Sequence, residues 1–125
     1  MCIDRKTAGA LAETETIRKY IENGYTFVAR NFWYKRMGEI DLILRREMQR
    51  EVSVLVFCEV KYRKNTDFAP PSAAVTRKKQ ARIRTLAQIF MGMHRELDSL
   101  AMRFDVAEVT LEKGKLSVNI LENAF

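Results

Sequence analysis

The sequence predicts a single α/β domain, and three observations support that fold class. The chain has 125 residues, which is enough for one domain with a hydrophobic core and too few for two. Hydrophobic residues make up 47% of it and charged residues 30%, a composition typical of a folded protein. Segments with helical and strand periodicity follow one another in the order helix, three strands, helix, two strands. Strands and helices in that order predict a sheet flanked by helices.

The first helix is expected over Arg5–Glu22, because the following Asn23-Gly24 pair is a helix stop signal. Apolar residues at three- and four-residue steps define its predicted buried stripe: Ala10, Ile17, Tyr20 and Ile21. Glu13 lies on the same stripe. We therefore expect its carboxylate to point toward the core or toward a group packed beside the helix.

Three strands should follow, over residues 25–32, 40–44 and 52–60. The polar segment between the second and the third strand predicts that these two form a hairpin. After a loop at Pro70 and Pro71, a long helix should start at Ser72 or Thr76 and run to Leu97. Its predicted buried stripe consists of Lys79, Ile83, Leu86, Phe90, Met93 and Leu97. Strands at 103–111 and 116–121 then flank a turn at Gly114.

Charge and composition indicate which partners and which compartment to expect. The net charge of +6 and the pI of about 9.5 favour polyanions, so nucleic acid is the leading partner. No apolar run approaches the roughly 20 residues of a membrane span, so no membrane partner is expected. The N-terminal residues do not resemble a secretory signal, and a cytoplasmic location is the expectation. Cys2 and Cys58 suit reduced thiols, with Cys58 in the core.

The segment F-C-E-V-K-Y-R, residues 57–63, ends an apolar strand with two charges on one face. Glu59 and Lys61 are two residues apart and therefore point the same way. If the hairpin turn centres near Arg50, Asp41 lies directly opposite Glu59 and shares that face. Two carboxylates so close repel each other unless a cation lies between them.

A hard divalent cation such as Mg²⁺ would take Asp41 and Glu59 as ligands, with Glu13 adding a third carboxylate through a water. Lys61 could then hold or activate the attacking water and offset charge that develops on a phosphorus. The alternative is a solvated cross-strand salt-bridge cluster, because an E-x-K triplet is common. Glu39 is either a fourth carboxylate or an ordinary residue at the start of a strand.

Four motifs occur together in this order: R-N-F-W-Y-K-R-M-G-E-I-D-L-I, F-C-E-V-K-Y-R, A-V-T-R-K-K-Q and R-F-D-V. On these motifs the chain resembles the bacterial YraN-like uncharacterised protein family. That family is similar to archaeal Holliday-junction resolvases and to the wider PD-(D/E)xK nuclease superfamily. The resemblance implies one restriction-endonuclease-like domain over residues 1–125, with a central mixed β-sheet flanked by helices.

The resemblance also implies roles for individual residues. Asp41 and Glu59 match the family's metal ligands, and Lys61 matches the catalytic lysine. Glu13 matches the first-helix glutamate, which completes the catalytic and metal-binding set. Lys79 and Gln80 match a helical K-Q pair that would face the site or the nucleic-acid backbone.

Aromatic and basic residues interleave just before the strand that carries Asp41, as expected of a surface that stacks bases and holds phosphates. Phosphate contacts are expected from Arg30, Lys35, Arg36, Lys78 and Lys79. Strand alternation places part of this cluster in the core, so either Trp33 or Tyr34 could be exposed. The alternative for the basic residues on the second helix is a solvated charged face.

Together these features predict an endonuclease that depends on Mg²⁺ or Mn²⁺ and hydrolyses phosphodiester bonds in DNA, including branched or otherwise structured DNA. The alternative is a non-catalytic nucleic-acid-binding or scaffold protein that keeps the nuclease fold. A third reading is a structural ion-pair cluster in a protein with a protein partner. A homodimer is an option by analogy with junction resolvases.

Overall fold

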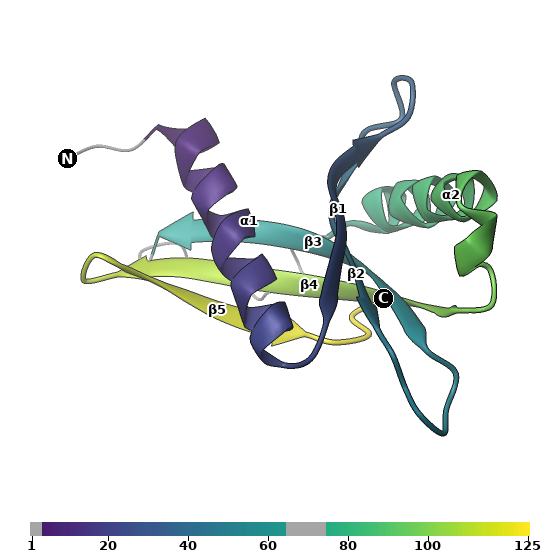
Figure 1. The fold of residues 1–125 in the computed structure, drawn as a ribbon. Coiled ribbons are helices and arrows are strands. Elements are labelled where there is room, and N and C mark those ends of the chain that lie inside the picture. Colours follow the sequence, from purple (N-terminus) through teal and green to yellow (C-terminus); the bar gives the residue numbers. More distant parts are fainter. Residues whose placement is uncertain (1–3, 65–74) are drawn as a thin grey trace.

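The computed structural model of the chain describes residues 4–64 and 75–125 and has one sheet with two helices packed on it (Figure 1). The elements in chain order are α1 (Arg5–Glu22), β1 (Thr26–Trp33), β2 (Glu39–Arg46), β3 (Val54–Lys64), α2 (Arg77–Met93), the 3₁₀ helix η2 (Arg95–Leu97), β4 (Ala101–Glu112) and β5 (Lys115–Leu121). The predicted α-β-β-β-α-β-β order is confirmed. Cys2, Pro70, Pro71 and Ser72 lie outside the described residues.

The sheet has five strands in the order β1-β2-β3-β4-β5. Three neighbouring pairs are antiparallel, whereas β3 and β4 are parallel. A parallel pair needs a crossover connection, and the segment containing α2 provides it. The predicted mixed sheet flanked by helices is therefore confirmed. Neither described helix combines the length and the apolar composition that a bilayer-spanning segment needs.

Each face of the sheet carries its own hydrophobic core, and alternation along β3 separates the two. Leu55 and Phe57 pack under α2, whereas Val56 and Cys58 pack under α1. The buried Cys58 confirms its predicted place in the core. By the same alternation Glu59 and Lys61 belong to the α2 face. The two charges of the F-C-E-V-K motif therefore lie beneath the start of α2.

Helix α1 has the predicted bounds but not the predicted buried stripe. It starts after Asp4, whose carboxylate accepts the backbone N–H of Thr7 at 2.8 Å. The residues that are buried recur at steps of four: Ala8, Ala12, Thr16 and Tyr20. The prediction was wrong for Ala10, which is exposed, and for Ile21, which is 52% exposed. Small residues let the helix backbone approach the sheet closely, and the Thr16 hydroxyl is satisfied by the Ala12 carbonyl at 2.8 Å.

Helix α2 begins at Arg77, with the Thr76 hydroxyl accepting the backbone N–H of Lys79 at 3.2 Å. It ends at Met93, so the predicted continuation to Leu97 is wrong. His94 leaves the helical conformation, and η2 then turns the chain so that Leu97 is buried. Met93, predicted to be buried, is 59% exposed for this reason.

Candidate functional site

The site is built where β2 and β3 separate. Leu42 pairs with Cys58, which is the register predicted for Asp41 and Glu59. The regular ladder ends at that pair, and the carboxylate of Asp41 accepts the backbone N–H of Val60 at 2.8 Å. Because the side chain takes over a hydrogen bond that the ladder would have made, Asp41 is held firmly at the point of divergence.

The twist of β2 about its own axis explains why Asp41 points toward α1. Ile40 and Leu42 are two residues apart, yet Ile40 packs in the core under α2 and Leu42 in the core under α1. A flat strand would place both on one face. The twist between them directs Asp41 toward α1, although its strand neighbour Glu59 belongs to the α2 face.

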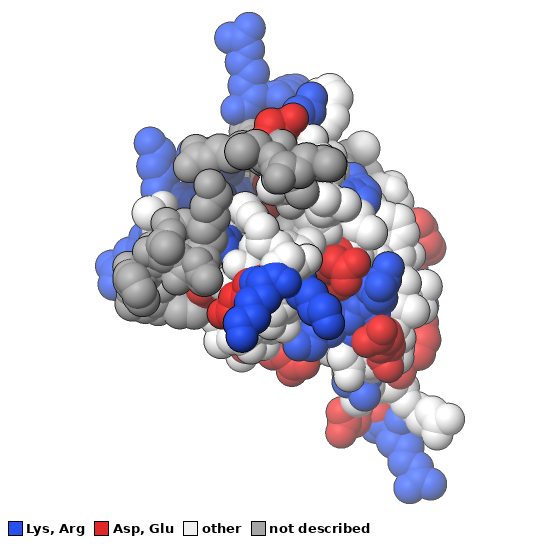
Figure 2. Space-filling view, turned by 90° about the vertical axis from the view of Figure 1, so that its left-hand side faces the viewer, with Lys and Arg blue, Asp and Glu red and all other residues white. Residues whose placement is uncertain are grey.

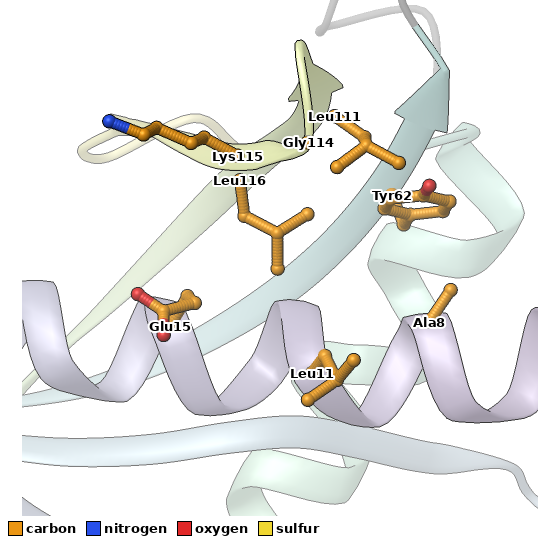
Figure 3. Close-up of a pocket in the computed structure, with 8 residues that line it drawn as sticks. All are labelled: Ala8, Leu11, Glu15, Tyr62, Leu111, Gly114, Lys115 and Leu116. Carbon is orange, nitrogen blue, oxygen red and sulfur yellow. The ribbon is translucent and has the colours of Figure 1, made fainter. Parts of the chain in front are cut away.

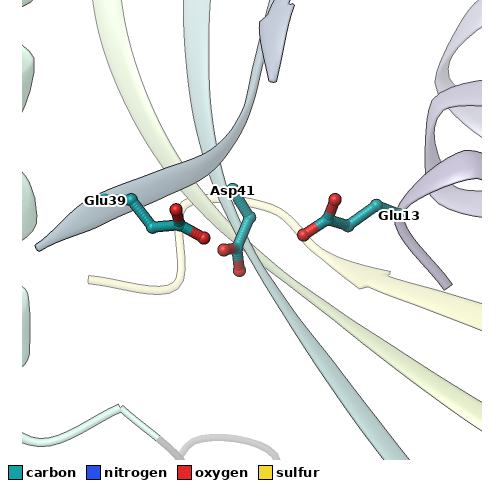
Figure 4. Close-up of side chains that lie close together, drawn as sticks. All are labelled: Glu13, Glu39 and Asp41. Atoms are coloured by element: carbon teal, nitrogen blue, oxygen red, sulfur yellow. The ribbon is translucent and has the colours of Figure 1, made fainter. Parts of the chain in front are cut away.

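Three carboxylates converge at this twist, and Figure 4 shows them pointing toward one another from α1 and β2. Glu13, Glu39 and Asp41 each offer an oxygen, and these oxygens lie within 4.8 Å of one another. Oxygen donors at this spacing are what Mg²⁺ or Mn²⁺ coordinates after a small adjustment. The structure brings together Glu13 and Asp41 as predicted, and it adds Glu39, which the sequence had left open.

Asn31 links two carboxylates of this cluster through hydrogen bonds, and it was not among the residues predicted for the site. Its amide nitrogen lies 3.2 Å from Oε2 of Glu13 and 3.3 Å from Oε1 of Glu39, so it donates to both side chains. Its backbone is left-handed, with φ of 54°. Asparagine tolerates that conformation better than most residues, so an asparagine inside a strand was the signal available.

Arg30 lies against α1 rather than standing free. Its guanidinium donates to Oε1 of Glu13 at 2.9 Å and to the backbone carbonyl of Ala10 at 3.1 Å. One of the five residues predicted to contact phosphate is thus engaged with a cluster carboxylate in this structure. A phosphate contact by Arg30 would require exchange of that ion pair, and it stays a prediction.

Glu59 is held by two lysines and lies outside the group of three oxygens among the described residues. Lys79 of α2 is 2.5 Å from its Oε1, and Lys61 is 3.5 Å from the same oxygen. The Glu59 side chain is only 5% exposed and is shielded from water, whereas the Lys61 and Lys79 side chains are 26% and 34% exposed. The predicted neighbours Glu59, Lys61 and Lys79 are together, with Glu59 bound to ammonium groups rather than placed among the cluster oxygens.

The electrostatics of the site follow from this crowding. Burial and then the charge of Glu59 raise the pKa of Asp41 to about 8, with Glu13 and Glu39 adding to the effect. Burial and the neighbouring Lys79 lower the pKa of Lys61. Burial also disfavours the charged form of Lys79, but the hydrogen bond and the charge of Glu59 outweigh it and raise the pKa of Lys79. Of the two lysines, Lys61 therefore gives up its proton more readily.

The remaining basic residues predicted to bind nucleic acid divide into two groups. Lys35 and Arg36, in the turn after β1, are exposed, and so is Lys78 on α2. Figure 2 shows Lys and Arg side chains projecting from the top of the molecule, where Figure 1 places the β1–β2 turn. Gln80 does not project: its amide donates to the backbone carbonyl of Val75 at 3.0 Å. Gln80 thus closes the start of α2.

An apolar groove of about 430 Å³ lies elsewhere, between α1 and the β4–β5 hairpin (Figure 3). Its lining includes Leu11, Tyr62, Leu111 and Leu116. None of the three cluster carboxylates lines it. Glu15 and Lys115 border the same groove, but its position makes it separate from the carboxylate cluster.

Fold and site together define a small α/β protein in which a mixed sheet, an acidic cluster and a buried Glu–Lys pair meet at the splayed end of a hairpin. The chain belongs to the uncharacterised protein family UPF0102, whose family model matches residues 12–109. The matched segment contains every residue of the acidic cluster and of the Glu–Lys pair.

Similar proteins from several bacteria extend over most of the chain. A UPF0102 protein of Acetivibrio thermocellus is 36% identical over 98% of this chain and 93% of its own length. One from Coxiella burnetii strain RSA 493 is 40% identical over 84% of this chain and 82% of its own length. One from Lachnoclostridium phytofermentans is 37% identical over 98% of this chain and 96% of its own length. The chain therefore corresponds to nearly the full length of these relatives.

Proposed function

We propose that this protein is a divalent-metal-dependent endonuclease that hydrolyses phosphodiester bonds in DNA. The observation that carries the proposal is the convergence of Glu13, Glu39 and Asp41 within 4.8 Å, next to the Glu59–Lys61 pair. Acidic oxygens gathered around one point, with a lysine beside them, are the groups that phosphoryl transfer requires. The resemblance to PD-(D/E)xK nucleases supports the same chemistry.

The donor set fits Mg²⁺ or Mn²⁺. All three groups are carboxylates, which suit hard cations, and the crowding that raises the pKa of Asp41 would be relieved by a positive charge. Glu13, Glu39 and Asp41 would hold the ion, with Glu59 joining after release from its lysines. A bound ion of this kind supplies Lewis-acid activation of water and of a phosphate oxygen.

The residues around the ion have distinct tasks in this proposal. Lys61, half-buried and with a lowered pKa, lies where it can contact the attacking water or the developing charge on the phosphate. Glu59 orients Lys61 through their 3.5 Å ion pair. Asn31 keeps Glu13 and Glu39 in place for binding. Lys79 offsets the charge of Glu59 before substrate arrives.

The polymer is inferred from charge. The net charge of +6 and the exposed Lys35, Arg36 and Lys78 favour a polyanion. DNA is the proposed substrate because the resemblance is to DNA nucleases. A homodimer that places two such sites on two strands is compatible with this activity and is measured by light scattering in solution.

The test is cleavage of a panel of duplex, branched and single-stranded DNAs and RNAs with Mg²⁺ or Mn²⁺, by the wild-type protein and by Lys61→Ala. Removing Lys61 deletes the cation at the reacting group but keeps all four carboxylates. Cleavage should fall roughly 10²- to 10³-fold, whereas binding should change little because one contact among several is lost. Lys115→Ala, an exposed lysine in the β4–β5 hairpin, is the matched control and should cleave normally.

The second candidate is a nucleic-acid-binding protein without catalytic activity. The ion pairs that Glu59 forms with both Lys61 and Lys79 favour it. A glutamate held in this way acts as a structural ion pair. If the wild-type protein binds metal and nucleic acid yet cuts no member of the panel, the endonuclease proposal fails and the binder takes its place.

A further inference from the structure

Trp33 is the most exposed of the large hydrophobic residues in the described ranges. Its relative exposure is 68%, and it is the only tryptophan of the chain. Tryptophan is usually well buried, because its large ring gains much free energy from leaving water. The exposed indole offers a flat apolar face at the end of a strand. Because single exposed apolar side chains are common on protein surfaces, the neighbours of this one decide whether it binds a ligand.

The indole lies beside the carboxylate cluster. Trp33 is the direct partner of Glu39 in the antiparallel β1–β2 ladder. Directly opposed residues share a face of the sheet, with Cβ atoms about 4.5–5.5 Å apart. Because Glu39 supplies one of the three converging oxygens, Trp33 starts from the backbone position next to a residue of the cluster and on the same face of the sheet.

Cations surround the same turn. Lys35 and Arg36 follow Trp33 and are exposed. From the other side, Arg82 of α2 reaches Gly38: its Cδ lies 3.0 Å from the position a Cβ of Gly38 would take. The left-handed backbone of Gly38, with φ of 104°, disfavours any other residue there, and a Cβ would also press on the Arg82 side chain. An exposed aromatic face near exposed cations matches a ligand that has both an apolar plane and negative charge.

We infer that Trp33 stacks on an unpaired nucleobase next to the scissile phosphate. The substrate class is therefore nucleic acid with an unstacked base at the reaction point, such as a single strand, a flap or a junction. In a continuous duplex both faces of each base are covered by neighbours, so stacking on the indole requires a base that is already free or easily displaced. This inference rests on the proposed function for the nature of the polymer and for the place of the base beside the scissile phosphate, whereas the stacking itself is tested without cleavage.

The single tryptophan makes the test direct, since its fluorescence reports the indole alone. The protein is titrated in EDTA with fluorescently labelled oligonucleotides of equal length: a thymidine single strand, a blunt hairpin duplex, and the same duplex with a flap. Anisotropy of the label measures binding, and tryptophan emission measures stacking. The single strand and the flap should quench the emission at saturation, and the blunt duplex should leave it nearly unchanged. A uridine single strand compares RNA with DNA in the same assay.

Variants separate stacking from general binding. Trp33→Ala should weaken affinity for the single strand and the flap roughly 5- to 100-fold, with less than about a 2-fold effect on the blunt duplex. Trp33→Phe should restore much of the loss, because a ring remains. Val52→Ala removes another exposed apolar side chain, 64% exposed near the start of β3, and should change nothing.

The possible outcomes distinguish the stacking role from the endonuclease proposal. Equal quenching by blunt duplex and single strand, or saturable binding without quenching, overturns the stacking role and leaves the endonuclease proposal intact. Selective quenching without cleavage by the wild-type protein in Mg²⁺ or Mn²⁺ keeps the stacking role and overturns the endonuclease. Absence of binding to every oligonucleotide, both in EDTA and with Ca²⁺ in its place, together with absence of cleavage in Mg²⁺ or Mn²⁺, overturns both.

Discussion

Asp41 shows most clearly how a single residue can connect fold and chemistry. Its carboxylate completes the β2–β3 junction by accepting the Val60 N–H, and it also faces the charges of Glu59, Glu13 and Glu39. Burial and these charges raise its pKa to about 8, which is the signature of a carboxylate that a cation would stabilise. The structural bond keeps Asp41 in a position that its charge disfavours.

Asp41→Asn tests this balance with a nearly isosteric change. The amide oxygen can still accept the Val60 N–H, while the carboxyl group whose ionisation the site disfavours is gone. The metal-free variant should be more stable than the wild type at pH 7, by on the order of 1–3 kcal/mol, because Asp41 must take up a proton on folding at that pH and asparagine need not. Thermal unfolding measures this.

In the same experiment Mn²⁺ should raise the Tm of the wild type, because an ion that binds only the folded state stabilises that state. The Tm of Asp41→Asn should stay nearly unchanged, because this variant has lost one of the ligands. Glu15→Gln removes a carboxylate of α1 that is not part of the three-oxygen group, and it should respond to Mn²⁺ as the wild type does. An equal Mn²⁺ effect in all three proteins would contradict the site.

At the scale of elements, a buried polar network fixes the sheet to α1 and to the C-terminal segment. Asp105 of β4 is fully buried and accepts from the Tyr20 hydroxyl of α1 at 2.7 Å and from the Arg103 guanidinium at 2.8 and 2.9 Å. It also accepts the backbone N–H of Asn123 at 3.0 Å. Arg103 and Asp105 share a face of β4 because they are two residues apart, and they form a salt bridge. This network anchors α1, and so it indirectly positions Glu13.

Asp105→Asn should destabilise the fold strongly, because Arg103 loses its counter-charge in a place with little water. The free energy of unfolding should fall by about 2–4 kcal/mol. This loss is somewhat smaller than that for breaking a fully buried ion pair, because the Arg103 side chain is 18% exposed. Denaturant unfolding measures the loss. Glu122→Gln removes the exposed partner of Arg103, 3.7 Å away, and should cost less than about 0.5 kcal/mol. Similar losses in both variants would contradict a central role for Asp105.

The same network predicts how stability responds to alkaline pH. Burial, and then the neighbouring Cys58 and Asp105, raise the pKa of Tyr20 above its ordinary value of 10.0. A phenol with a raised folded-state pKa contributes stability below pH 10, and this contribution is lost as pH rises beyond it, because the unfolded chain then releases the proton first. The stability gap between the wild type and Tyr20→Phe should therefore be largest near neutral pH and shrink above pH 10.

Denaturant unfolding at several pH values measures that gap, and tyrosinate absorbance follows the ionisation. The absorbance difference between the two proteins should appear only as the circular dichroism of the folded state disappears. Ionisation of Tyr20 in a protein that is still folded would contradict the network as described.

At the scale of the whole molecule, charge is distributed in two ways. The acidic cluster is concentrated where β2 and β3 diverge, while the net charge of +6 comes from basic residues that are largely exposed. Local acidity surrounded by a positive surface suits a protein that attracts a polyanion and places a cation at one point of it.

Nucleic-acid affinity should therefore depend strongly on salt. Changing Lys35, Arg36 and Lys78 together to glutamine should lower the slope of log affinity against log salt concentration by about 2–3, as each lost phosphate contact removes roughly 0.7–0.9. Lys6, Lys113 and Lys115, exposed at the start of α1 and in the β4–β5 turn, form a control triple of equal charge. Anisotropy titrations over a range of salt give the slopes. An equal decrease in both triple variants would place the binding surface elsewhere.

Local signals in the sequence determined most of the secondary structure. The bounds of α1 follow from helical periodicity up to the Asn23-Gly24 stop, and the β2–β3 register follows from a turn centred near Arg50. Alternation along β3 was enough to place Glu59 and Lys61 on one face and Cys58 in the core. These features depend on neighbours within a few residues, so a single sequence contains the information that fixes them.

Only the tertiary structure decided which groups surround the site. The twist of β2 between Ile40 and Leu42 turns Asp41 toward α1, and the left-handed Asn31 joins Glu13 to Glu39. Packing between segments also decided which residues of α1 are buried, where α2 ends, and that Lys79 contacts Glu59. Each of these depends on contacts between segments distant along the chain. Periodicity within one segment cannot determine such contacts, because it sets which residues share a face but not what that face meets.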